Sequence, residues 1–134
     1  MFETEQMQMQ NNDIKPSKHR LLILNYLNTS SVTHLTADDI FEHFRNSEHN
    51  ISLATIYNTL NLFKEKNIVS FVRMQNGEYK YETTLGEHVH FECIKCKKIY
   101  NMPSIKEYFE ENNEGFIVKE QEVLFRGICN DCNT

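Results

Sequence analysis

Apolar residues recur at helical spacing in the first half of the chain. Leu21, Leu24 and Leu27 lie three residues apart, which predicts a helix that begins near Pro16 and buries one face. Residues 1–13 are acidic and polar and show no such spacing. We therefore expect them to form a solvated, disordered tail.

Two more helices are predicted by residues that can cap a helix N-terminus. Thr36 is followed three residues later by Asp39, an Asp version of the capping box. Ser52 can cap a further helix that runs to about Lys66, since serine is a preferred N-cap residue.

The helix after Ser52 has two distinct sides. Its apolar side, which we expect in the core, consists of Ile56, Leu60 and Phe63. Its other side and flanks carry Ala54, Thr55, Tyr57, Asn58, Asn61 and Glu65. Amides and hydroxyls can hydrogen-bond base edges in a DNA major groove, whereas a merely solvated helix is usually rich in Lys and Glu. An ordinary polar surface stays open as the alternative.

A β-hairpin is predicted directly after this helix. Residues 68–74 alternate between apolar and polar side chains, and residues 78–82 can pair with them. Asn76-Gly77 between the two segments is a strong hairpin signal. Three helices followed by a hairpin is the element order of a winged helix.

The last third of the chain has a different pattern. Residues 88–101 predict two short strands that meet at a cysteine knuckle, and Ser104 can cap a helix that runs to about Asn113. Residues 116–128 then predict a strand. We place the domain boundary near residues 83–86, which gives an α+β fold with a small second domain.

The chain contains two C-x-x-C pairs and no other cysteine. The pairs are Cys93/Cys96 and Cys129/Cys132, and two such thiolate pairs can complete a tetrahedral structural zinc site. The gap between them exceeds the roughly 15–20 residues of a one-piece zinc ribbon, so the second pair comes from a distant strand. The alternative is a redox dithiol, but such a pair usually stands alone at a helix N-terminus.

Charge and composition limit the possible partners and location. The 134 residues carry a formal net charge of −5, which on its own is a weak basis for DNA binding. Residues 14–82 are nearly balanced in charge, so the excess of acids lies elsewhere. No apolar run is long enough to span a bilayer, and the N-terminus has no signal-peptide core. We expect a cytoplasmic protein with no membrane partner.

Histidines point to a second metal. His88 and His90 lie two apart, so on a strand both side chains lie on one face. Glu82 precedes them, and His34 lies just before the capped helix at Thr36. Imidazoles with a carboxylate suit Fe²⁺, Mn²⁺, Co²⁺ or Zn²⁺. Surface histidines without a metal are the alternative.

Three motifs in this order resemble the ferric uptake regulator (Fur) family. They are the run from His34 to Ile40, the helix segment from Ser52 to Leu60, and the His-Val-His-x-x-Cys-x-x-Cys run that begins at His88. With the terminal cysteine pair, the resemblance covers residues 15–132. It implies a winged-helix DNA-binding domain over residues 14–83 and a dimerisation and metal-binding domain over residues 84–134.

The resemblance also implies functions for single residues. The structural zinc ligands are Cys93, Cys96, Cys129 and Cys132. The regulatory metal ligands are His34, Glu82, His88, His90 and, as an amide in place of the usual carboxylate, Asn101. The candidate DNA contacts are Arg20, Ser52, Thr55, Tyr57, Asn58 and Asn61. We expect a homodimer that represses at an A·T-rich palindromic operator when Fe²⁺ or Mn²⁺ is bound.

Departures from the family pattern narrow the branch. Asn58 resembles the peroxide-sensing (PerR) branch, where many iron-uptake members carry Arg. Many iron-uptake members have an additional metal site that needs His, Asp and Glu. This chain has Glu87, Val89 and Lys106 at those positions, so we expect it to lack that site. Asn101, in place of the usual carboxylate, removes one negative charge from the regulatory metal site, and Glu87 or Glu92 can supply that charge instead.

An iron-uptake or zinc-type regulator is the alternative within the family. A small metalloenzyme and a zinc-stapled interaction module are the alternatives outside it, but no general base is evident, so we do not expect an enzyme.

Overall fold

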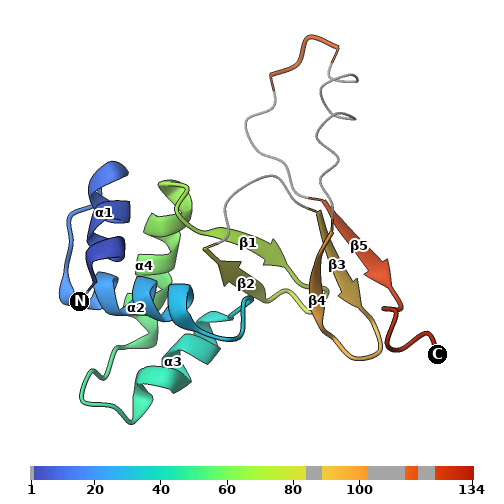
Figure 1. Ribbon diagram of the computed structural model, residues 1–134, viewed down its shortest axis with the longest axis horizontal. Coiled ribbons are helices and arrows are strands. Elements are labelled where there is room, and N and C mark those ends of the chain that lie inside the picture. Colours follow the sequence, from blue (N-terminus) through green and yellow to red (C-terminus); the bar gives the residue numbers. More distant parts are fainter. Residues whose placement is uncertain (1, 84–88, 103–113, 118–122) are drawn as a thin grey trace. The chain divides into compact units, whose positions relative to one another are not determined.

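The computed structural model describes residues 2–83, 89–102, 114–117 and 123–134. It divides into two compact units, Met1–Leu85 and Gly86–Thr134. The elements of the first unit are α1 (Glu3–Asn11), α2 (Lys18–Thr29), α3 (Ala37–Arg45), α4 (Leu53–Glu65), β1 (Ser70–Arg73) and β2 (Tyr79–Glu82), as Figure 1 shows. Those described in the second unit are β3 (Val89–Cys93), β4 (Ile99–Met102) and β5 (Leu124–Gly127). None of the described helices is both long and apolar enough to cross a bilayer.

The predicted N-caps lie where the sequence placed them. At α3, the Thr36 side chain accepts from the Asp39 backbone N–H at 3.0 Å, and the Asp39 carboxylate accepts from the Thr36 N–H at 2.9 Å. Ser52 accepts from the Thr55 N–H at the start of α4. These bonds satisfy backbone donors that have no partner inside the helix.

The hairpin begins immediately after α4. Asn67 adopts a left-handed conformation with φ 61°, which asparagine tolerates better than most residues. The Ile68 N–H then donates to the Phe63 carbonyl at 3.0 Å. At the hairpin turn, Gly77 has φ 91°, and β1 and β2 pair antiparallel.

The core of the first unit lies between α2, α3 and α4. Ile56, Leu60 and Phe63 of α4 are each fully buried, as the helical pattern predicted. Ile23 and Leu24 of α2 are also fully buried. Three packed helices followed by a two-stranded hairpin are a winged helix, so the predicted fold of this region is confirmed.

The expectation of a disordered N-terminal tail is wrong. Residues 3–11 form α1, and Met9 is fully buried in the core of the first unit. Asn28 of α2 donates to the buried Glu5 carboxylate at 2.7 Å and to Gln8 at 2.9 Å. The segment packs through one buried methionine and through polar contacts to α2, so its sequence shows no apolar periodicity. The hydrophobic pattern therefore did not predict this helix.

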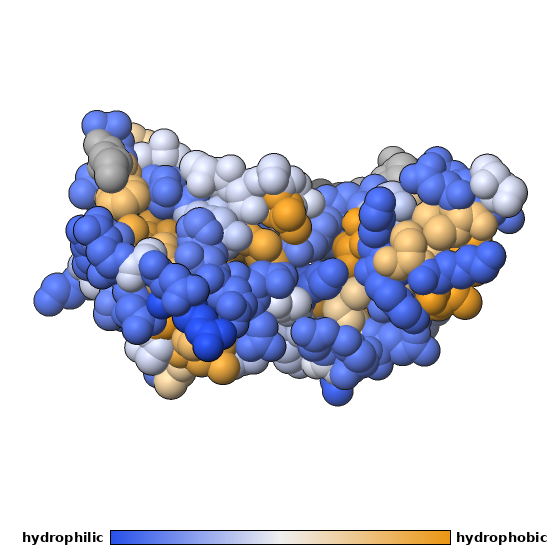
Figure 2. Space-filling model, turned by 90° about the horizontal axis from the view of Figure 1, so that it is seen from below, coloured by the Kyte–Doolittle hydropathy of each residue, from blue (hydrophilic) through white to orange (hydrophobic). Residues whose placement is uncertain are grey.

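The second unit contains a three-stranded sheet with the order β4-β3-β5. β3 pairs antiparallel with β4 and parallel with β5. Of the strand expected over residues 116–128, the structure has β5, while residues 118–122 and the helix expected over residues 104–113 lie outside the described residues. Apolar side chains reach the surface of this unit, as the orange areas in Figure 2 show. The large hydrophobic side chains that are exposed in the described part of this unit are Ile94, Met102, Phe116, Ile117, Phe125 and Ile128.

Candidate metal centres and nucleic-acid interface

The four cysteines gather where β3 and β5 end. Cys93 is the last residue of β3, and it lies opposite Gly127 in the parallel register with β5. Both cysteine pairs therefore leave the sheet at the same edge. The sulfur atoms of Cys93, Cys96, Cys129 and Cys132 all lie within 4.8 Å of one another, and those of Cys96 and Cys129 are 3.8 Å apart. Zn–S bonds of about 2.3 Å in a tetrahedron place the sulfurs about 3.8 Å apart, so this cluster fits a zinc ion.

The surroundings of the sulfurs also favour a bound cation. The backbone N–H groups of Cys96 and Cys129 donate to the Cys93 sulfur at 3.4 and 3.5 Å, and they lower the pKa of Cys93 to about 6. Contact with Cys129 raises the pKa of Cys132 to about 12. Four thiols this close cannot all ionise unaided, whereas zinc binds them as thiolates and releases their protons.

A histidine and a carboxylate meet inside the first unit. Leu35 and Tyr81 form a two-bond backbone bridge, with N···O distances of 3.0 and 2.7 Å. This bridge brings the neighbouring residues His34 and Glu82 together, and His34 Nε2 lies 3.0 Å from Glu82 Oε2. Both side chains are buried, at 8% and 2% exposure. Two ligands at about 2.1 Å and at right angles are also about 3 Å apart, so the pair fits two neighbouring ligands of one cation.

The second unit places other predicted ligands on one face of its sheet. His90 lies directly opposite Asn101 in the β3–β4 register, so their side chains share a face. His90 is buried and Asn101 is exposed. His88 lies outside the described residues.

The outer face of α4 is open, as its pattern predicted. Tyr57 is 43% exposed, and Asn58 and Asn61 are also exposed. Ser52 lies at the start of this face and donates to the Thr55 hydroxyl at 2.9 Å. The helix therefore presents amide and hydroxyl groups that can contact base edges.

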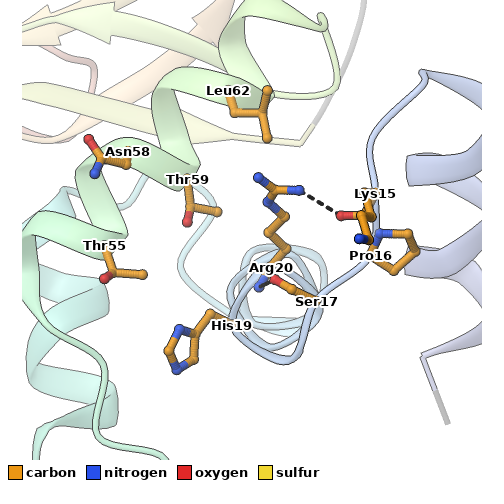
Figure 3. Close-up of a pocket in the computed structure, with 9 residues that line it drawn as sticks. All are labelled: Lys15, Pro16, Ser17, His19, Arg20, Thr55, Asn58, Thr59 and Leu62. Atoms are coloured by element: carbon orange, nitrogen blue, oxygen red, sulfur yellow. Dashed lines mark hydrogen bonds between the residues drawn. The ribbon is translucent and has the colours of Figure 1, made fainter.

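Three of the candidate DNA contacts share one pocket. Thr55 and Asn58 of α4 and Arg20 of α2 line a pocket of about 550 Å³ between the two helices. Figure 3 shows Arg20 between α4 and the Lys15–Pro16 segment, where it donates to the Lys15 carbonyl at 2.7 Å. The α2 end of this pocket is cationic and lies beside the outer face of α4.

Sequence reasoning did not single out the other polar residues of this pocket. Lys15, Ser17, His19 and Thr59 complete its polar lining. Thr59 is buried at 6% exposure, whereas His19 is exposed. Positive charge is concentrated around the start of α2, at Lys15, Lys18 and Arg20. This charge was the feature of the sequence that could have pointed to the pocket.

A winged helix with an open polar face on its third core helix, followed by a unit with a four-cysteine cluster, defines a class of metal-binding transcription regulators. Residues 11–126 match the model of the ferric uptake regulator family. The chain belongs to this family, and it is a metal-responsive DNA-binding transcription regulator.

Relatives from two branches are similar to the chain. The peroxide operon regulator of Bacillus subtilis (strain 168) is 31% identical over 124 residues, which cover 90% of this chain and 83% of that protein. The ferric uptake regulation protein of Bordetella parapertussis is 27% identical, and the alignment covers 96% of each chain.

Solved structures agree with the fold. The ferric uptake regulator from Pseudomonas aeruginosa with manganese matches with a TM-score of 0.76 at 18% identity, covering 94% of this chain and 98% of that one. The structure of PerR from Streptococcus pyogenes matches with a TM-score of 0.54 at 28% identity, covering 98% of this chain and 92% of that one. The predicted fold class, a winged helix followed by a small α/β domain with a four-cysteine site, is thus confirmed.

Proposed function

We propose that this protein is a peroxide-responsive repressor, in which a regulatory divalent cation controls binding to its operator. The supporting observation is the buried pair of His34 and Glu82, held 3.0 Å apart by the bridge between Leu35 and Tyr81. A buried imidazole beside a buried carboxylate suits Fe²⁺ or Mn²⁺ better than a soft metal.

The full ligand set of this cation is part of the proposal. His34 and Glu82 belong to the first unit, whereas His88, His90 and Asn101 belong to the second. We propose that all five hold one cation, which would fix the orientation of the DNA-reading unit. The four cysteines would hold a separate, structural zinc ion.

The DNA-binding part of the proposal rests on α4 and the neighbouring pocket. The residues that would contact base edges are Tyr57, Asn58 and Asn61. Contacts to the DNA phosphate backbone, which would fix the position of the helix, would come from Thr55, Ser52 and Arg20. Fur-family regulators act as dimers, and a two-fold dimer presents two such helices to successive major grooves. We therefore propose a palindromic, A·T-rich operator.

The exposed apolar residues of the second unit support a dimer of this chain. Phe125 is 52% exposed and lies on β5, while Phe116 and Ile117 are 75% and 80% exposed. Large apolar side chains that are this exposed can form part of a protein–protein interface. We propose that a second copy of the chain covers them.

Peroxide sensing is proposed over plain iron sensing for two reasons. Asn58 resembles the peroxide-sensing branch, and relatives from that branch are 31–32% identical to the chain. When bound, Fe²⁺ supplies the redox chemistry through which peroxide oxidises a neighbouring imidazole. The chain contributes the histidines, and loss of one of these donors would release the operator.

A gel shift with full-length, zinc-loaded protein tests this function. Binding to an A·T-rich palindrome is expected with Mn²⁺ or Fe²⁺ and is expected to be lost with chelator. His90→Ala should abolish the response to metal while the zinc content stays unchanged. His43→Ala, a change at an exposed histidine outside the ligand set, is the matched control.

Adding peroxide separates the remaining possibilities. A peroxide sensor loses DNA binding in the Fe²⁺ form only, and one of its histidine peptides gains the mass of one oxygen atom. Retained DNA binding after peroxide indicates an iron-uptake-type regulator instead. Consumption of many equivalents of peroxide per chain would indicate an enzyme and would contradict the proposal.

A further inference from the structure

One face of the sheet in the second unit carries a buried acid, Glu92, that the proposed set of five ligands does not include. His90 and Glu92 lie two apart on β3, so their side chains share this face. Asn101 lies opposite His90, and Arg126 lies opposite Glu92 on β5. The Glu92 side chain is 5% exposed, and Arg126 Nε lies 3.0 Å from its Oε1 atom.

The charges on this face are unevenly distributed. Glu92 is the only acid within β3, β4 and β5. The residue that faces His90 across β3 and β4 is Asn101, which is neutral. Arg126 is 41% exposed and can be solvated without its partner, whereas Glu92 is nearly sealed from water. A carboxylate buried in this way needs a cation beside it. Arg126 is the cation that the described residues supply.

Glu92 is also within reach of the proposed metal ligands. It is the diagonal neighbour of Asn101 across β3 and β4, and diagonal positions about 7–8 Å apart are bridged by long side chains. A glutamate that turns toward this position would bring a hard oxygen donor to the site, of the kind that Mn²⁺ and Fe²⁺ prefer.

We propose that Glu92 supplies the second carboxylate of the regulatory metal site in place of the uncharged Asn101, and that it exchanges Arg126 for the metal ion. This inference rests on the proposed regulatory site at His90. With Glu82 and Glu92 both present, two carboxylates balance the charge of a divalent cation. Arg126 then competes with the metal for the same carboxylate.

The test compares two single variants whose effects must have opposite signs. Mn²⁺ affinity is measured by calorimetry on full-length, zinc-loaded protein. Glu92→Gln should weaken Mn²⁺ binding by roughly 10–100-fold, because it removes the charged donor. Arg126→Gln should strengthen Mn²⁺ binding, because it removes the competing cation. If the pair only holds β3 against β5, Arg126→Gln breaks it and Glu92→Gln weakens it, so both affinities shift in the same direction, or neither shifts. Either of these results overturns the inference.

Two further variants make the result specific. In the Glu92→Gln background, Asn101→Asp should restore Mn²⁺ affinity, since it returns a carboxylate to the position opposite His90. Circular dichroism and zinc content should match the parent, because glutamine can still accept the hydrogen bond from Arg126. His90→Ala should abolish Mn²⁺ binding. If His90→Ala abolishes Mn²⁺ binding but the Glu92 and Arg126 variants respond alike, the proposed regulatory site stands and the inference about Glu92 is wrong. If His90→Ala leaves Mn²⁺ binding intact, both the regulatory site and the inference are wrong.

Discussion

At the scale of single residues, the capping box of α3 does more than begin a helix. Thr36 and Asp39 exchange two hydrogen bonds of 2.9 and 3.0 Å, which fixes the direction in which the chain enters α3. Leu35, directly before Thr36, is tied to Tyr81 by the backbone bridge. The position of His34 beside Glu82 therefore depends on a cap and a bridge that lie next to it in the sequence.

Replacing Thr36 by alanine tests how much the cap contributes. Thr36→Ala leaves one helical N–H without its partner and should lower the free energy of unfolding by about 1 kcal/mol, as measured by urea denaturation. Thr29→Ala, at an exposed residue at the end of α2, should change it by less than about 0.5 kcal/mol. Equal losses from the two variants would contradict a special function of the cap.

At the scale of elements, the sequence predicts what is encoded locally. The periodicity of α2 and α4, the caps at Thr36 and Ser52 and the Asn-Gly turn each involve residues close together in the chain, and all are found in the structure. α1 could not be predicted in this way. Its contacts are with the core and with Asn28 of α2, 23 residues beyond Glu5, so nothing within the segment itself signals them.

The docking of α1 can be measured through its two methionines. Met9 is fully buried, whereas Met7 on the same helix is 63% exposed. Met9→Ala should lower the free energy of unfolding by about 2–5 kcal/mol, because it opens a cavity in the core. Met7→Ala should have an effect within about 0.5 kcal/mol. Indistinguishable urea midpoints for the two variants would mean that α1 does not pack on the core in solution.

At the scale of the whole molecule, the two units differ in what stabilises them. The first unit has an extended apolar core contributed by its helices and hairpin. In the described part of the second unit, the buried hydrophobic residues are Val89 and the two cysteines Cys93 and Cys129. The C-x-x-C spacing predicted the cysteine cluster from the sequence. The meeting of His34 with Glu82 was implied only by the resemblance, because it depends on a bridge between distant segments.

This difference predicts separate responses to the loss of zinc. Strands of four or five residues bury too little apolar surface to order a unit on their own. We therefore expect the zinc ion proposed at the cysteines to supply much of the folding free energy there. Chelation under reducing conditions should therefore abolish hydrogen-exchange protection in β3 and β5. Protection in α2 and α4 should persist, since their core contains none of the cysteines. Re-added zinc should restore the protection of the strands, which separates metal loss from irreversible damage. Simultaneous loss of protection in both units would instead show that the first unit depends on the second for its stability.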